Sequence, residues 1–200
     1  MTEPSFAEDD GDYAGRTFRG VKAAGTVVQN VVFTDCVFDR CVFSRAEFLQ
    51  CSFTGCAFRT SDLSLARFTS SRFVDTAFSE SKLIGIDWPS VTNVRALPLT
   101  IGFEACVVSH SSFAGLNLRR LKLERCVAER VDFGGADLTE ATFGETDFSG
   151  ATFDDTTLTG ADFRGARGYV IDPRRNRVAR AKFSMPDAVG LLHALDVVID

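Results

Sequence analysis

Residues 131–150 read VDFGG ADLTE ATFGE TDFSG, four consecutive quintets with a large apolar residue at each third position. Steps of five from Tyr13 to Phe163 meet no charged residue, and 18 of the 19 Phe residues lie on this phase. An amphipathic helix would repeat its apolar face every 3.6 residues, and a half-buried strand every 2 residues. Neither element explains a period of five, so the chain repeats a different short backbone unit.

A second restricted column lies two residues before each large apolar centre. It holds mostly small residues, and Arg16 is its only charged member between residues 13 and 163. Side chains two residues apart in an extended segment point to the same face, so each quintet has two inward and three outward positions. The outward positions carry nearly all the charged residues and glycines of the repeat. An extended step followed by a polar corner, repeated many times, predicts a solenoid with one narrow apolar core.

The quintets resemble a known repeat. ADLTE (136–140), TDFSG (146–150) and ADFRG (161–165) are similar to the A(D/N)LXX units of pentapeptide repeat proteins, and the resemblance covers roughly residues 13 to 166. It implies an all-β fold, a right-handed quadrilateral β-helix with four quintets per coil. Phe rings four quintets apart would then stack in columns.

We divide the chain into a flexible acidic N-terminus (1–12), the repeat β-helix (13–166) and a C-terminal exit segment, helix and dimerisation tail (167–200). The pattern fails over residues 89–102, where Asn93 and Pro98 occupy centre positions, but it returns in phase at Phe103. An insertion of arbitrary length would usually shift the phase. We therefore expect three distorted faces within the shaft, bent by prolines that cannot donate ladder hydrogen bonds, with a functional loop as the alternative.

The tail contains a predicted capping helix and a short strand. Ser184, Pro186 and Asp187 form a helix start, and the helix is expected to run to about Leu195. A solenoid needs such a cover for its last coil. The segment from Tyr169 to Asp200 resembles the tail of pentapeptide proteins that act on gyrase, which implies a symmetric homodimer. The expected interface residues are Leu191, Leu192, Leu195, Val197, Val198 and Ile199.

Residues that could carry chemistry are few. All six cysteines occupy the small inward column, which favours buried thiols over disulfides or a metal site. His110 falls on an outward corner and His193 in the tail, with no nucleophile or carboxylate arranged around either. We predict no catalytic, cofactor or metal site, and therefore no enzyme.

The basic residues between 174 and 182 are interpreted as a solvated face rather than a nucleic-acid patch. The chain begins with acidic residues and contains no apolar run long enough to span a membrane. We therefore expect a location in the cytoplasm, without membrane contact.

Charge is distributed unevenly along the chain. The net charge is -5, and residues 131–163 hold eight acidic residues and no Lys or Arg. If the carboxy ends meet at a dyad, these coils flank the centre of a long rod, which is the charge layout of a DNA imitator. Four quintets per coil would distribute the acids over all four sides. The predicted partner contacts are the corner residues Glu140, Glu145, Asp154 and Asp155, followed by Asp132, Asp137 and Asp147.

Two functions remain from the sequence. The resemblance implies a protein that occupies the DNA site of gyrase, a type IIA topoisomerase, and protects it from a poison of the quinolone or albicidin type. The alternative is a scaffold or adaptor with an unknown protein partner. Plasmid-type quinolone-resistance members of the family carry loops that project from the shaft. No phase-breaking insertion of that kind is present here, so the sequence does not identify the poison.

Overall fold

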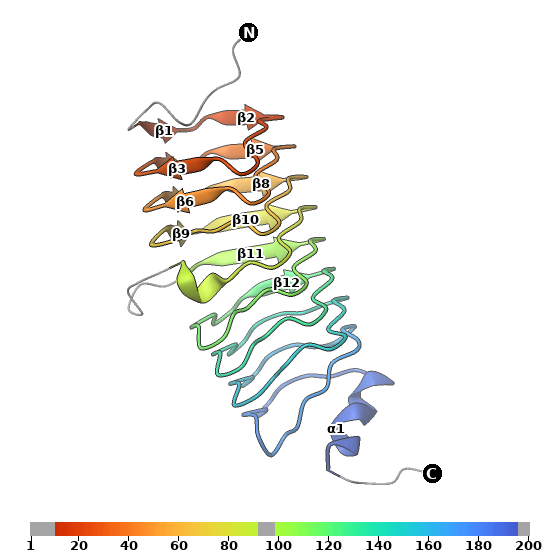
Figure 1. Ribbon diagram of the computed structural model, residues 1–200. Coiled ribbons are helices and arrows are strands. Elements are labelled where there is room, and N and C mark those ends of the chain that lie inside the picture. The colour runs from red at the N-terminus through yellow and green to blue at the C-terminus, as the bar shows by residue number, and fades with distance from the viewer. Residues whose placement is uncertain (1–10, 92–98, 196–200) are drawn as a thin grey trace.

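The computed structural model describes residues 11–91 and 99–195, which form a shaft of stacked coils with a short helical segment at its C-terminal end (Figure 1). Predictions about residues 1–10, about the middle of the irregular segment and about Val197, Val198 and Ile199 lie outside the described residues.

Strands of successive coils pair in parallel, and each residue faces the residue four quintets later in the chain. Phe33 pairs with Phe53, and Phe53 with Phe73. Because this step holds four quintets, each coil has four sides. In the described residues the strands form three parallel sheets, of four, six and two strands. Single bridges extend the pattern to Lys182. The predicted quadrilateral β-helix is confirmed.

Each element is short because a side of the coil leaves room for only a few extended residues between two corners. The strands are β1 (Asp12–Ala14), β2 (Thr17–Arg19), β3 (Val27–Gln29), β4 (Val32–Thr34), β5 (Val37–Asp39), β6 (Glu47–Leu49), β7 (Ser52–Thr54), β8 (Ala57–Arg59), β9 (Arg72–Val74), β10 (Thr76–Ser79), β11 (Ile101–Glu104) and β12 (Lys122–Glu124). The helical elements are the 3-10 helices η1 (Trp88–Ser90) and η2 (Asp187–Val189) and the α-helix α1 (Gly190–His193).

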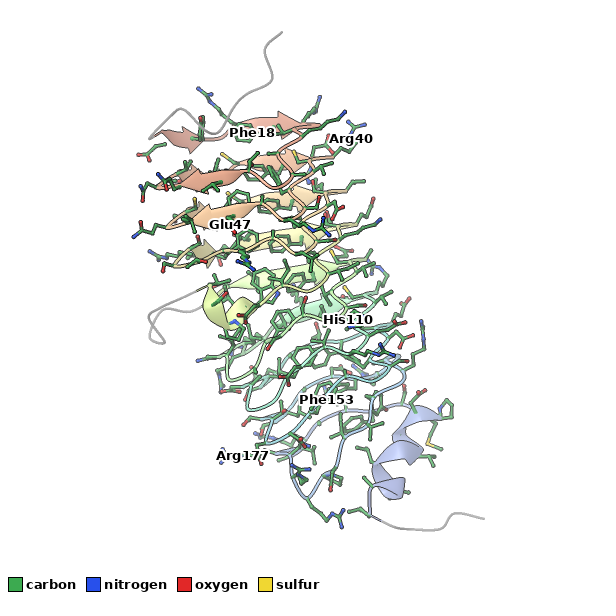
Figure 2. All side chains as sticks on the ribbon, viewed as in Figure 1. Phe18, Arg40, Glu47, His110, Phe153 and Arg177 are labelled. Atoms are coloured by element: carbon green, nitrogen blue, oxygen red, sulfur yellow. The ribbon has the colours of Figure 1, made fainter. Side chains whose placement is uncertain are left out.

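The core consists of the two inward columns that the sequence predicts. Phe53 is fully buried, and its ring stacks on Phe33 and Phe73 with centroid distances of 5.1 and 4.7 Å. All six cysteines are buried and free. In Figure 2, Phe153 lies inside the shaft, whereas Arg40 projects from its edge.

At most corners of the described shaft the chain turns through a left-handed residue, the second after the inward centre. The φ angle is +59° at Leu65 and +60° at both His110 and Glu140. The N–H of this residue donates to the next coil, as from Glu140 to the Thr159 carbonyl at 2.9 Å. Because a Cβ atom makes this conformation costly, most corners hold glycine or a polar residue.

One coil is longer than the others. Thr76 pairs with Ile101 and Lys82 with Val107, both at a step of five quintets instead of four. Trp88 still stacks on Phe68 of the preceding coil, so the core column stays in line. The expectation of three distorted faces within the shaft is therefore corrected. This coil contains one quintet more than the other coils, which have one quintet for each of their four sides. One whole repeat leaves the phase unchanged, which is why the sequence pattern resumes in register.

The C-terminal helix is shorter than predicted, since η2 and α1 together span only residues 187–193. Ser184 is not the helix cap. Its hydroxyl oxygen accepts a hydrogen bond from the Gly165 N–H at 2.9 Å, and Asp187 accepts one from the Gly168 N–H at 3.3 Å. These bonds attach the segment to the preceding coil, and Leu191 packs against the core. Of the helices in the described part of the chain, none is long and apolar enough to cross a membrane.

Candidate functional site

The predicted acidic residues lie on different sides of the shaft. Asp137 and Asp147 are two quintets apart, which is two sides of a coil, so they face opposite directions. Glu140 and Glu145 occupy successive corners. The fold therefore does not gather the acids into one stripe.

Asp132 and Asp154 lie on adjacent coils near Gly134. A Cβ atom on Gly134 would lie 3.1 Å from the Asp132 carboxylate and 3.8 Å from the Asp154 carbonyl. The missing side chain of Gly134 therefore leaves room for the Asp132 carboxylate beside the backbone of the next coil.

Arginines from neighbouring coils pair with many of these acids. Each ion pair joins residues about one coil apart: Arg119 with Asp137 (3.3 Å), Arg120 with Glu140 (2.9 Å), Arg167 with Asp147 (3.1 Å) and Arg175 with Asp154 (3.2 Å). The segment 131–163 contains no basic residue in sequence, but the coils before and after it supply four. Sequence reasoning missed these arginines, although counting by four quintets would have aligned Arg120 with Glu140.

Three of the predicted contacts keep an uncompensated charge. Glu145, Asp155 and Asp132 form no ion pair with any residue in the described ranges. Glu145 and Asp155 are exposed at left-handed corners, with φ of +57° and +53°. Asp132 is half-buried and accepts a hydrogen bond from the Gly134 N–H at 2.9 Å. Glu145 and Asp155 can therefore meet a cationic partner without breaking an existing pair.

Local hydrogen bonds keep several of the other carboxyl groups charged. The hydrogen bond from Arg120 lowers the pKa of Glu140. The Ser149 hydroxyl lowers the pKa of Asp147 against the opposing effect of burial, and Arg167 adds to the lowering. Burial also opposes ionisation of Asp137, but hydrogen bonds from Thr139 and Arg119 outweigh it and lower the pKa. These three carboxylates are anionic at neutral pH, and they contribute to the structure as well as to the surface charge.

The tail residues divide into two groups. Leu191 is partly buried against the core, so it belongs to the cap of the last coil. Leu192 and Leu195 are 42% and 37% exposed, and the nearby tail residues Val170 and Met185 are exposed further. The structure therefore leaves apolar surface at the C-terminal end of the shaft.

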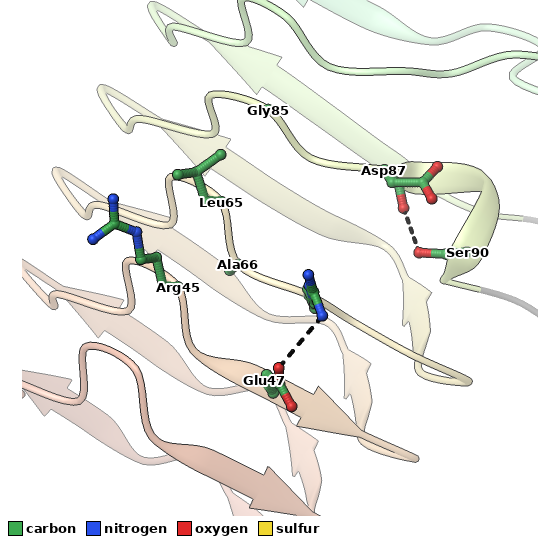
Figure 3. Close-up of a pocket in the computed structure, with 8 residues that line it drawn as sticks. Arg45, Glu47, Leu65, Ala66, Gly85, Asp87 and Ser90 are labelled. Atoms are coloured by element: carbon green, nitrogen blue, oxygen red, sulfur yellow. Dashed lines mark hydrogen bonds and ion pairs between the residues drawn. The ribbon is translucent and has the colours of Figure 1, made fainter.

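A hollow of about 420 Å³ lies on the outer surface beside η1, and no sequence prediction pointed to it (Figure 3). It spans three successive coils. The lining residues are Arg45, Glu47, Leu65, Ala66, Arg67, Gly85, Asp87 and Ser90. Leu65 is exposed at a corner, and a sequence search for apolar residues in outward corner positions would have found it.

The described residues contain no group of three His, Cys, Asp or Glu side chains arranged to hold a metal ion. Cys106 and Cys126 are neighbours in the inward column, and the Cys126 sulfur accepts a hydrogen bond from the Cys106 N–H at 3.4 Å. Desolvation raises the pKa of the Cys56 thiol to about 11, which disfavours the reactive thiolate. His110 is exposed at its corner, as predicted.

Two family models match the sequence. The model described as a pentapeptide repeat region matches residues 17–96, and the one described as pentapeptide repeats (8 copies) matches residues 132–167. Comparison with curated proteins finds no match.

Similar chains are also found among solved structures. A trypsin-treated variant of QnrB1, described as a plasmid-mediated fluoroquinolone resistance protein, aligns at 18% identity over 94% of this chain and 97% of that chain, with a TM-score of 0.60. HetL, a protein involved in heterocyst differentiation regulation from the cyanobacterium Nostoc sp. Strain PCC 7120, aligns at 16% identity over 88% and 87% of the two chains, with a TM-score of 0.32.

Proposed function

Because this chain belongs to the pentapeptide repeat family, we propose that it is a non-catalytic protein that binds DNA gyrase and protects it from a poison. The poison would be a quinolone, an albicidin or another compound that traps the enzyme on DNA. The fold supports this proposal, since QnrB1 has a similar shaft and is a fluoroquinolone resistance protein. A shared fold does not by itself identify a partner, so the charged surface has to supply the recognition.

The observation that carries the proposal is that Glu145 and Asp155 are exposed at corners of the shaft and form no ion pair with any described residue; the two corners are two quintets apart and therefore lie on opposite sides of the shaft. Asp132 adds a third charge to the same coils. A basic groove that normally holds DNA offers closely spaced cations, and a stiff anionic surface is complementary to it. The remaining predicted acids already form ion pairs with arginines, and they contribute only to the long-range electrostatic field. They are Asp137, Glu140, Asp147 and Asp154.

We further propose that two chains join through their C-terminal ends. The apolar surface at Leu192 and Leu195 supports this, together with the apolar residues Val197, Val198 and Ile199 that follow in the sequence. A symmetric end-to-end dimer would place the acidic coils of both chains near its centre. The result is a rod long enough to replace a DNA segment. No direct contact with nucleic acid is part of this proposal.

Cleavage and supercoiling assays with purified gyrase test the proposal. Low concentrations of the protein should reduce poison-stabilised cleavage, and high concentrations should inhibit supercoiling, because a competitor for the DNA site acts on the enzyme as well as the drug. Protein that neither binds gyrase at low salt nor alters cleavage by any poison would favour the scaffold alternative.

Two double variants with the same change in net charge refine this test. Glu145→Gln with Asp155→Asn removes unpaired charges, whereas Glu140→Gln with Asp154→Asn removes paired ones. Both should slow association to a similar extent, because steering depends on total charge. The first should also speed dissociation by about fivefold, as expected for two exposed ion pairs lost from the complex. Equal dissociation rates for the two would show that corner contacts do not carry binding.

A further inference from the structure

We infer that the hollow beside η1 is a second contact site for gyrase, one that receives an apolar side chain of the enzyme with an acidic neighbour on one side and a basic neighbour on the other. This inference rests on the proposed function. The hollow lies on coils that precede the acidic segment 131–163, so it would add a contact that the acidic coils cannot make.

Leu65 occupies a position that the fold itself does not favour for leucine. Its φ is +59°, and its side chain is 47% exposed. Among the left-handed corners in the described residues, it is the only one with a large apolar side chain. A side chain with a Cβ is strained in this conformation, and because nearly half of the leucine side chain stays exposed to water, its burial offsets only part of that cost. Strain of this kind at an exposed apolar residue points to binding rather than stability.

Gly85 makes room for Leu65. It holds the same corner one coil later, and a Cβ atom built on it would lie 2.7 Å from the Leu65 Cδ2 atom. The missing side chain lets the leucine lie across the corner and form one wall of the hollow. Ala66 is buried beside it, so the middle of the hollow is apolar.

The rim of the hollow carries opposite charges at its two ends. Arg45 projects next to Leu65, and Asp87 lies across the hollow beside Ser90 (Figure 3). Within the described part of the chain, neither Arg45 nor Asp87 forms an ion pair, whereas Arg67 pairs with Glu47 at 3.6 Å. A ligand would therefore find a guanidinium at one end and a carboxylate at the other, neither of them paired with a residue in the described ranges.

These features define the occupant by charge complementarity. An extended protein segment could place an apolar side chain against Leu65 and Gly85, a carboxylate near Arg45 and a cation near Asp87. The hollow is large enough for such a side chain, and its walls are corners and bridged residues of three stacked coils. Because an apolar contact is insensitive to salt, this site would hold the complex when the acidic coils are screened.

The test compares Leu65→Asn with wild type in binding to purified gyrase at low and high salt. Asparagine tolerates the left-handed conformation, so the variant should be at least as stable as wild type. We expect its dissociation rate to rise about tenfold, with the association rate and its salt dependence unchanged. His110→Asn is the matched control, because His110 has a φ of +60° in the same corner column and does not line the hollow.

Each outcome decides the inference. If wild type binds gyrase and Leu65→Asn dissociates at the wild-type rate, or no faster than His110→Asn, the second site is wrong and the proposed function stands. Failure of wild type to bind would overturn both. Arg45→Gln is an independent variant, expected to speed dissociation about threefold through loss of one exposed ion pair. If Leu65→Asn does not fold, an unchanged rate for Arg45→Gln would still overturn the inference.

Discussion

At the level of single residues, the two inward positions of a quintet contribute in different ways. The large centres stack ring on ring along the shaft, as Phe53 does between Phe33 and Phe73. The small residues bind the backbone of adjacent coils: the Ser61 hydroxyl oxygen accepts from the Cys41 N–H at 3.0 Å and donates to the Phe38 carbonyl at 3.2 Å, both in the preceding coil. This explains why serine, threonine and cysteine, which carry a donor on a short side chain, are common in the small column.

Phe53→Ala tests the stacked core. The ring is fully buried in a narrow shaft, and the backbone ladder on each side prevents the neighbours from closing the cavity. We expect the free energy of unfolding to fall by roughly 3 to 5 kcal/mol. Chemical denaturation followed by circular dichroism measures it. Phe53→Leu, which leaves a smaller cavity, should lose less, and an alanine variant as stable as wild type would contradict the inward assignment.

Asp147→Asn tests the carboxylate network by its pH dependence. Ser149 and Arg167 lower the folded-state pKa of Asp147, so its stabilisation is present above the unfolded pKa and is lost as pH falls through the folded value. The variant should be less stable than wild type at neutral pH, and the difference should vanish in strong acid. Denaturation curves at several pH values provide the measurement. Asp155→Asn is the control, since the exposed Asp155 has no ion pair within the described residues, and it should change stability little at neutral pH.

At the level of the secondary-structure elements, the unit of structure is the coil rather than the strand. Strands have three or four residues, too few to be stable alone, and each gains its partners from the coils before and after it. The long coil shows that a coil can change its length without disturbing the core stack. It takes one additional quintet while Trp88 still stacks between Phe68 and Phe113, because whole repeats return the chain to the same side of the shaft.

Deletion of residues 92–96 tests this account of the long coil. Loss of one quintet restores the usual step of four and keeps every later inward residue in phase. The deletion variant should fold with an unchanged β-sheet signal and a melting temperature within a few degrees of wild type. Deletion of residues 92–94 is the control. It shifts the phase by three residues, which moves later inward residues to outward positions, so the protein should aggregate or have a much lower melting temperature. Equal behaviour of the two deletions would contradict the role of phase.

At the level of the complete shaft, the two ends differ. The N-terminal coil begins at β1 and β2, whereas the C-terminal coil is covered by η2 and α1 with Leu191 on the core. The outer surface of this cover keeps exposed leucines, so it closes the core but leaves an apolar face. A partner for that face would complete the burial that the single chain leaves unfinished.

Leu192→Asp tests the proposed dimer. A charge placed in an apolar interface without a partner costs several kcal/mol, so association should weaken by at least about a hundredfold while the β-sheet signal stays unchanged. Sedimentation at micromolar concentration measures the oligomeric state. Val27→Asp, at a residue 48% exposed near the other end of the shaft, is the matched control and should sediment like wild type. A wild-type chain that is monomeric under these conditions would exclude the dimer.

The inside and outside of the shaft could be predicted from the sequence alone, because facing inward or outward is a local property of each quintet. The buried column from Phe18 to Phe163, the buried cysteines and the exposed corner at His110 all follow from a phase of five. Features that depend on neighbours one coil away required the three-dimensional structure. Arg120 lies beside Glu140 and Leu65 beside Gly85 because the coils stack at a step of four quintets, a step that the family resemblance implied but no single quintet records. The additional repeat in one coil is visible only in the strand pairing, because a whole quintet leaves the phase of the sequence unchanged.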